Sequence, residues 1–245
     1  MMAMGKAAER KALRQGLQTL NENMGTLAEL SELAIRRAID SFAQFDTKAA
    51  DEVFLLDKEI YALQIEVERT CLDLIALHAP VASDLRAITT SLKITTDFDR
   101  IGRYAKDIAE ITLQFPKGNA SPVDRLPGLP KMVEITIHMV DVAADGFVKR
   151  DVEAVRNLAV VDDDVDELHD ATFSEIVRAM ESGSLAVETG SRYILVVRYL
   201  ERIADHAVNI GERVVYMVTG ESLPRIRAAE RARGHSPPSN AGQKP

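Results

Sequence analysis

The sequence has almost no cysteine, and this excludes two kinds of structural chemistry. It contains a single cysteine, Cys71, in 245 residues. One thiol cannot form an internal disulfide framework, and it supplies too few ligands for a thiolate zinc site. Because Cys71 lies beside an apolar stripe, we expect a small buried side chain rather than a nucleophile. Such cysteine usage fits a reducing cytosol, and we expect a cytoplasmic protein.

Long apolar runs are also missing. No stretch free of Asp, Glu, Lys and Arg exceeds ten residues, the length of 74–83, whereas a membrane-spanning helix needs about 20 apolar residues. The first residues, MMAMGKAAERKAL, carry charges where a secretory signal has an apolar segment. The sequence therefore predicts neither membrane insertion nor export.

An excess of positive charge is absent as well. The chain has 30 Lys and Arg against 38 Asp and Glu, a formal net charge of -8 at pH 7. Nucleic-acid binding depends on a basic face, so we expect no nucleic-acid partner. With 46% hydrophobic and 28% charged residues, the composition is that of a globular protein. At roughly 150 residues per domain, the length corresponds to one large domain or two small ones.

Proline is absent from residues 1–79 and 131–223. Since proline costs about 3 kcal/mol in a helix interior, each of these spans can hold several helices. The segment between them, PKGNASPVDRLPGLP at 116–130, has four prolines and two glycines and is typical of a linker. We expect one domain at 1–116, a linker at 117–129, a second domain at 130–220 and a basic, disordered tail at 221–245.

Apolar residues recur in steps of three and four, which places them on one face of a helix. One such run is Leu200, Ile203, Ala207, Ile210, Val214 and Met217. A sustained alternation of period two is not found. The pattern predicts an all-α protein with six helices, at about 8–45, 47–78, 83–115, 130–149, 152–181 and 186–219. Asp46 and Asp151 are candidate N-caps and Gly220 a candidate C-terminal stop. Short turns make successive helices antiparallel neighbours, which gives two three-helix bundles.

The two halves of the sequence align with each other. An offset of 105 residues places Asp57 on Asp162 and Leu63 on Leu168. After a three-residue difference, DRIGRYAKDI at 99–108 aligns with ERIADHAVNI at 201–210. We infer a tandem duplication that produced two bundles related by a pseudo-twofold axis.

Acidic residues in the second half form a candidate metal site. Glu201 and Asp205 are one helical turn apart and share a face, where their repulsion costs a few tenths of a kcal/mol. Asp162 and Asp166 make a second such pair on the preceding helix. If the two helices pack through their apolar stripes, the four carboxylates converge, with Asn209 one turn beyond Asp205. Oxygen clusters of this kind suit magnesium, manganese, iron or zinc.

Other interpretations of these residues stay open. Carboxylate pairs often form a solvated face, and Arg198 and Arg202 can supply the counter-charge. His169 and His206 adjoin the pairs and can either join a metal site or be ordinary exposed or core histidines.

The first half also departs from the pattern, since Tyr61 and Arg103 align with Asp166 and Asp205. The carboxylates that survive there are Asp57, Asp99 and Asp107, and a bidentate arginine ion pair can satisfy such groups without a metal.

The sequence resembles the PhoU family of phosphate-signalling regulators over about residues 8–220. The resemblance rests on APVASDLR at 79–86, on the aligned helices DRIGRYAKDI and ERIADHAVNI, and on the aspartates at 57 and 162. It implies a fold of two similar three-helix bundles and a negative regulator of the phosphate-starvation response. It also implies two partners, the ATPase subunit of a phosphate ABC transporter and a sensor histidine kinase. Members carry multinuclear iron or zinc clusters on Glu/Asp-x-x-x-Asp pairs, so we expect a divalent or trivalent metal, preferentially on the second half.

Catalytic signatures are absent. A ferritin-type di-metal centre needs Glu-x-x-His twice, and no histidine here has a glutamate three residues before it. The sequence also lacks a phosphate-binding loop, a nucleophile elbow and a His-Glu-x-x-His zinc motif. We therefore expect a regulator rather than an enzyme. The alternatives are a helical adaptor without metal and, less favoured, a metal-dependent enzyme, and whether the chain forms a homodimer is left open.

Overall fold

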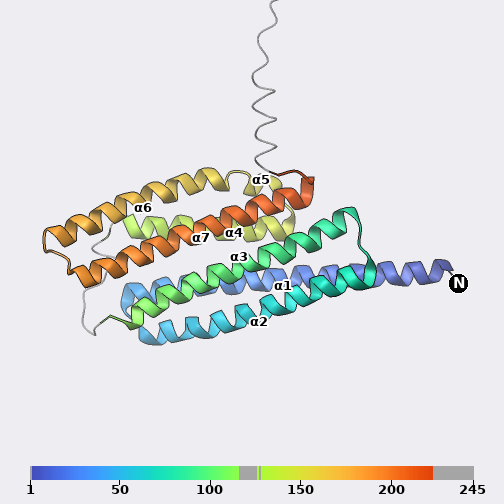
Figure 1. Cartoon of the computed structure of the whole chain (residues 1–245), viewed down its shortest axis with the longest axis horizontal. Coiled ribbons are helices and arrows are strands. Elements are labelled where there is room, and N and C mark those ends of the chain that lie inside the picture. Colours follow the sequence, from blue (N-terminus) through green and yellow to red (C-terminus); the bar gives the residue numbers. More distant parts are fainter. Residues whose placement is uncertain (1, 116–125, 127, 223–245) are drawn as a thin grey trace, which may run out of the picture.

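The computed structural model describes residues 2–115, 126 and 128–222, and this part of the chain is helical, without a strand. Six long helices and one single turn follow one another along the chain (Figure 1). They are α1 (Met2–Gln44), α2 (Thr47–His78), α3 (Ala82–Leu113), α4 (Gly128–Lys149), α5 (Val152–Val155), α6 (Leu158–Glu181) and α7 (Val187–Thr219). The predicted all-α fold is confirmed. The expected linker falls largely, and the expected tail almost entirely, outside the described residues.

The turns that begin α2 and α5 repeat the same local structure. Asp46 caps α2 by accepting hydrogen bonds from the backbone N–H groups of Lys48 and Ala49. Asp151 caps α5 in the same way, accepting from the N–H groups of the residues two and three positions later. The residue before each aspartate has a positive φ, 52° at Phe45 and 55° at Arg150. Both predicted N-caps are confirmed, and the matching turns support the inferred duplication.

The other helix ends differ in how they are capped. Gly220 ends α7 with a φ of 77°, and its N–H donates to the carbonyl of Tyr216. A left-handed residue at this position favours glycine, so the predicted stop is confirmed. Helix α3 begins after Val81, which makes no side-chain capping bond.

The expected helix at 152–181 is interrupted, and its prediction as one continuous rod was wrong. The chain forms the single turn α5, breaks at Arg156 and Asn157, and resumes as α6. Val155 packs where α4 and α7 both lack a side chain, at Gly146 and Gly211. A Cβ on Gly211 would lie 2.8 Å from Leu158 Cδ1 and 3.3 Å from Val155 Cβ. The break brings both apolar residues against α7, a close approach that hydrophobic periodicity does not reveal.

The helices form two bundles that share one core. Helices α1, α2 and α3 pack together, as do α4, α6 and α7, and the bundles meet through the pairs α3–α7 and α1–α4. Figure 1 shows α3 and α7 side by side at the centre of the molecule. Cys71 is fully buried, and burial raises the pKa of its thiol to about 12, as expected for a side chain of the core. Among the described residues, no helix has the length and apolar character needed to cross a membrane.

Candidate metal centre

Four carboxylates from α6 and α7 lie near one another beside the seam between these helices. Burial raises the pKa of Asp162 to about 7, and the negative charges of Asp166, Asp205 and Glu201 add to this shift. A shift by several like charges requires that all of them be close. The two acidic pairs, which are separated by more than 30 residues in sequence, are thus brought together by the packing of α6 on α7.

Two buried carboxylate oxygens in this cluster have no hydrogen bond within the described residues. Asp162 Oδ1 and Glu201 Oε2 are buried without a hydrogen-bond donor in the described part of the chain, although Arg202 Nε forms a 3.9 Å ion pair with Glu201 Oε2. The pKa of Glu201 is raised by its burial and by Asp205, against the opposing charges of Arg198, Arg202 and His169. Buried carboxylates that repel each other and lack donors are stabilised by a cation. The chemistry of these oxygen donors therefore suits a hard or borderline metal ion, whereas their present arrangement does not hold one.

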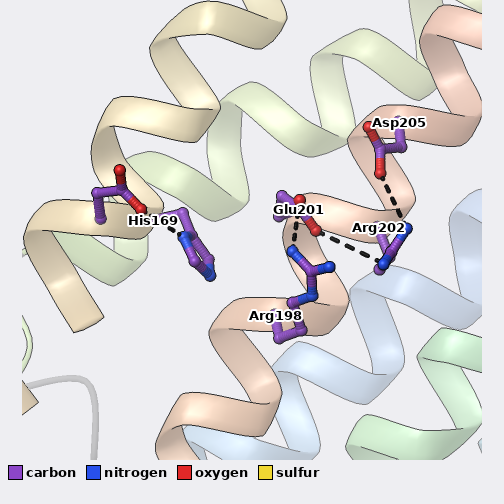
Figure 2. Close-up of polar contacts among 6 residues, drawn as sticks. His169, Arg198, Glu201, Arg202 and Asp205 are labelled. Atoms are coloured by element: carbon purple, nitrogen blue, oxygen red, sulfur yellow. Dashed lines mark hydrogen bonds and ion pairs between the residues drawn. The ribbon is translucent and has the colours of Figure 1, made fainter.

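Arginines supply part of this positive charge. Arg198 Nη1 donates to Glu201 Oε1 at 2.6 Å, and Arg202 Nη1 lies 3.5 Å from Asp205 Oδ2 (Figure 2). Within the described ranges, no three carboxylate, histidine or cysteine side chains are arranged closely enough to hold a metal as they stand. Figure 2 shows that Glu201 and Asp205 each turn toward an arginine of their own helix. A metal would compete with these ion pairs.

The remaining candidates of the second half differ in where they point. His169 lies on the side of α6 that faces α7 (Figure 2), and its Nδ1 is 3.1 Å from Asp170 Oδ1. His206 lies away from the carboxylates, with Nδ1 2.9 Å from Asp97 Oδ1 of α3. Asn209 is exposed and forms no side-chain hydrogen bond within the described residues. Of these three, His169 is the one placed next to the cluster.

In the first half, cationic side chains occupy the corresponding region. Arg103 Nε donates to Asp99 Oδ2 at 2.9 Å, and its guanidinium lies 5.6 Å from the ring centroid of Tyr61. Lys106 Nζ is 3.6 Å from Asp57 Oδ2. The arginine uses one carboxylate oxygen, because Asp99 Oδ1 has no partner in the described structure, so the expected bidentate pairing is wrong in detail.

Asp107 is the third acid of this half. Burial raises its pKa, and the positive charges of Lys106 and Arg103 oppose the shift. The three carboxylates of the first half therefore lie among protein cations, whereas Asp162 and Asp166 of the second half form no ion pair within the described residues. The two halves present related acidic positions in different electrostatic settings.

Asp97 is a buried acidic residue that the sequence analysis did not identify. Its side chain is 7% exposed, and Oδ1 and Oδ2 lie 2.9 Å from His206 Nδ1 and 3.1 Å from Arg213 Nε of α7. The offset of 102 residues that aligns α3 with α7 pairs Asp97 with Tyr199 and Tyr104 with His206. The rings of Tyr104 and Tyr199 stack at 5.7 Å. The offset therefore relates the Asp97–His206 contact to the Tyr104–Tyr199 contact, but the positions that face each other are known only from the packing of α3 on α7.

The chain is similar to known proteins over nearly its whole length. A family model described as "PhoU domain" matches twice, at residues 24–112 and 129–214. A phosphate-specific transport system accessory protein PhoU homolog of Zymomonas mobilis is 33% identical over 226 residues, covering 91% of this chain and 92% of that protein. A PhoU homolog 1 of Mycobacterium tuberculosis is 33% identical over 86% of this chain and 95% of its own length.

Solved structures agree with these matches. The phosphate transport system regulatory protein PhoU from Streptococcus pneumoniae superposes with a TM-score of 0.78 at 27% identity, covering 86% of this chain and 98% of that one. PhoU from Pseudomonas aeruginosa gives a TM-score of 0.72 at 27% identity, covering 88% and 99%. The family model matches the two bundles separately, as expected for a duplicated unit. The chain belongs to the PhoU family.

Proposed function

We propose that this chain regulates phosphate uptake and the phosphate-starvation response. The observation that carries the proposal is similarity along most of the chain to proteins named as accessory to a phosphate-specific transport system. The relatives are named as accessory or regulatory proteins, and we propose that this chain likewise acts by binding partners rather than by catalysis.

The proposed partners are the ATPase subunit of a phosphate ABC transporter and a sensor histidine kinase. Both follow from the family to which the chain belongs, and both are reached from the cytoplasm, where we propose that the protein acts. In this role it holds the starvation response off while phosphate is plentiful. The long helices of the two bundles offer extended surfaces for such contacts.

We further propose that the second bundle holds a divalent or trivalent metal, iron or zinc, on Asp162, Asp166, Glu201 and Asp205. The buried Oδ1 of Asp162, which has neither a hydrogen bond nor an ion pair within the described residues, supports this assignment, as does Glu201 Oε2, which has no hydrogen-bond donor and only a 3.9 Å ion pair with Arg202 Nε. When bound, the metal would neutralise the mutual repulsion of the carboxylates and fix α6 against α7. The chain's own part is to hold the acids on adjacent helices, with Arg198 and Arg202 balancing their charge in the absence of metal.

A second candidate is a phosphate-system adaptor that binds no metal. The ion pairs of Arg198 with Glu201 and of Arg202 with Asp205 favour it, since they already satisfy part of the acidic charge. The two candidates differ in metal content. Elemental analysis of the full chain, purified without chelator or nickel resin, separates them: stoichiometric metal supports the first, and none supports the second.

A reporter assay tests the regulatory role. In a strain that lacks the gene for this chain, a phosphate-starvation promoter should be active in phosphate-rich medium, and the wild-type chain should repress it. A chain that does not restore repression would contradict the proposal. The double variant Glu201→Gln/Asp205→Asn should lose repression if metal is required and keep it if the chain is an adaptor. A pull-down in high and low phosphate then identifies which proposed partner binds.

A further inference from the structure

A groove lies between the two bundles, where α3 packs against the last turns of α7. It encloses about 320 Å³ and faces α3, whereas the acidic cluster of α7 faces α6. A volume of this size lies in the lower range of small-molecule sites, which begins near ~300 Å³. Its lining comprises Thr89, Thr90 and Lys93 of α3, Glu212, Arg213 and Tyr216 of α7, and Ser222.

Two cations of the groove have unused binding capacity. Lys93 is exposed and forms no hydrogen bond or ion pair within the described residues. Arg213 is anchored through Nε, which lies 3.1 Å from Oδ2 of the buried Asp97. This ion pair holds the guanidinium beside Asp97 without a hydrogen bond to Oδ2, and its two terminal nitrogens make no hydrogen bond in the described part of the chain. A positioned guanidinium with free N–H groups is suited to bind oxyanions.

Hydroxyl groups surround these cations. Thr90 is 3% exposed, and Thr89 bonds through its hydroxyl to the carbonyls of Leu85 and Arg86. The ring of Tyr216 is 45% exposed and adds a flat apolar wall with a polar tip. Because the Thr89 hydroxyl donates to the backbone, the lining offers two positive charges together with the hydroxyl groups of Tyr216 and Ser222 as donors. Glu212 is the one acidic residue in the lining.

The duplication supplies an internal comparison for this groove. Under the offset of 102 residues, Lys93 corresponds to Leu195, Arg213 to Ile111 and Thr90 to Arg192. At that end of the interface, the guanidinium of Arg192 lies 5.4 Å from the ring centroid of Phe115 and 2.9 Å from a carboxylate oxygen of Glu188 on its own helix. The corresponding end thus has apolar residues and a paired arginine in place of Lys93, which has no ion pair within the described residues, and Arg213, whose terminal nitrogens make no hydrogen bond there.

We propose that this groove binds the phosphoryl group of a small molecule, with Lys93 and Arg213 as its charge partners. Because α3 and α7 belong to different bundles, a ligand held between them links the two halves. The site is separate from the metal centre and does not depend on metal. Its ligand is either free inorganic phosphate or an organic phosphate whose apolar part lies against Tyr216.

Calorimetric titration of the full chain, in EDTA and at constant ionic strength, tests the proposal with two probes, inorganic phosphate and ADP. EDTA removes binding that depends on metal. Saturable binding of either probe is expected, and binding of ADP more tightly than phosphate identifies an organic phosphate as the ligand type. Binding of phosphate alone identifies the free ion. Failure of both probes to bind would overturn the proposal.

Two substitutions test the location of the site. Lys93→Met should weaken binding about tenfold, because it removes one charge-assisted contact, and should not disturb the fold, since Lys93 makes no polar contact in the described structure. Lys58→Met, at an exposed lysine of α2 outside the groove, is the matched control and should leave the affinity unchanged. Equal affinities of wild type and Lys93→Met would refute the site.

Glu212→Gln tests the sign of the ligand's charge. An anionic ligand is repelled by this carboxylate, so the substitution should strengthen binding several-fold. Weaker binding of this variant would contradict the proposal, because it would mean that the ligand uses the acid. Since all three variants keep residues 223–245 unchanged, the basic residues of that segment contribute equally to each measurement.

Discussion

The two halves of this protein descend from one repeat but treat their acidic residues differently. In the first half, Arg103 stands where the second half has Asp205, and it binds Asp99 and covers Tyr61. Both halves keep buried carboxylate oxygens without hydrogen-bond donors in the described structure, Asp99 Oδ1 in the first and Asp162 Oδ1 and Glu201 Oε2 in the second. The difference lies in the partners of the aspartates: Asp57 and Asp99 pair with Lys106 and Arg103, whereas Asp162 and Asp166 form no ion pair within the described residues. Duplication can thus separate one inherited arrangement into a structural half and a binding half.

Removing the acids of the second half should have the largest effect. We expect Glu201→Gln/Asp205→Asn to lose its metal, because neutral amide oxygens bind a multivalent cation much more weakly than charged carboxylate oxygens do. Elemental analysis after dialysis measures this. The matched control is Asp57→Asn/Asp99→Asn. Asp99 aligns with Glu201 and Asp57 with Asp162, and this variant should keep the metal. If the first variant keeps its metal and the control loses it, the metal lies in the first half and not in the second.

Converting the first half to the second-half pattern should create a metal site. The triple variant Tyr61→Asp/Arg103→Asp/Lys106→Val gives the residue types found at the aligned positions 166, 205 and 208. Without metal it should be less stable than wild type by on the order of 2 kcal/mol, since Asp99 loses its donor. Added metal should restore stability by binding only the folded state. Denaturant unfolding with and without metal checks this.

If this triple variant binds no additional metal, the three exchanged side chains do not account for the difference in metal binding between the halves. Arg103→Lys serves as its control, because it keeps a positive charge next to Asp99. That variant should bind no additional metal and should lose only part of the stability.

The pH dependence of the metal-free protein should also separate the halves. The pKa of Asp162 is raised to about 7, so from pH 4 to 7 the folded state binds a proton that the unfolded state has released. The free energy of unfolding therefore falls as pH rises through this range. Asp162→Asn should remove this loss and stabilise the metal-free protein at pH 8 by about 1–2 kcal/mol, after allowance for solvent screening.

Thermal unfolding in EDTA at pH 5 and pH 8 measures this difference. The aligned variant Asp57→Asn should instead destabilise the protein slightly or not at all, because Asp57 is paired with Lys106. A wild-type protein that becomes more stable from pH 5 to pH 8 would contradict the raised pKa of Asp162, as would an Asp162→Asn variant with the same pH dependence of stability as wild type.

The smallest expected effect comes from the arginines that compete with metal. Arg198→Met frees Glu201, so metal affinity should rise a few-fold while the metal-free protein loses less than about 1 kcal/mol. Arg69→Met, which breaks an exposed ion pair with Asp73 on α2, is the control and should leave metal affinity unchanged. Unchanged affinity in Arg198→Met would indicate that the Arg198–Glu201 pair does not oppose metal binding.

Much of the fold could be predicted because it follows from local patterns. The steps of three and four place Ile203, Ala207 and Ile210 in the core, and the caps at Asp46 and Asp151 follow from the residue type. The break between α5 and α6 could not be predicted in this way. It depends on Val155 reaching Gly146 and Gly211, residues from two other helices, and such contacts leave no period in the sequence.

In the candidate site, too, some features follow from local sequence patterns and others depend on contacts or side-chain conformations that the sequence does not reveal. Helical spacing predicted that Glu201 and Asp205 share a face, and their proximity to Asp162 follows from antiparallel packing. The rotation of Glu201 toward Arg198 could not be read from the sequence, because several rotamers of a long side chain fit the same backbone. The role of Asp97 was also missed, since its partners His206 and Arg213 lie more than 100 residues away.

Anomalous diffraction from crystals of the metal-loaded full chain tests the central claim most directly, because it locates the metal within the duplicated fold. We predict that metal signal lies between α6 and α7, within coordination distance of Asp162, Asp166, Glu201 and Asp205, and that none lies near Asp57 and Asp99. Signal confined to the first half, beside Asp57 and Asp99, would contradict the account.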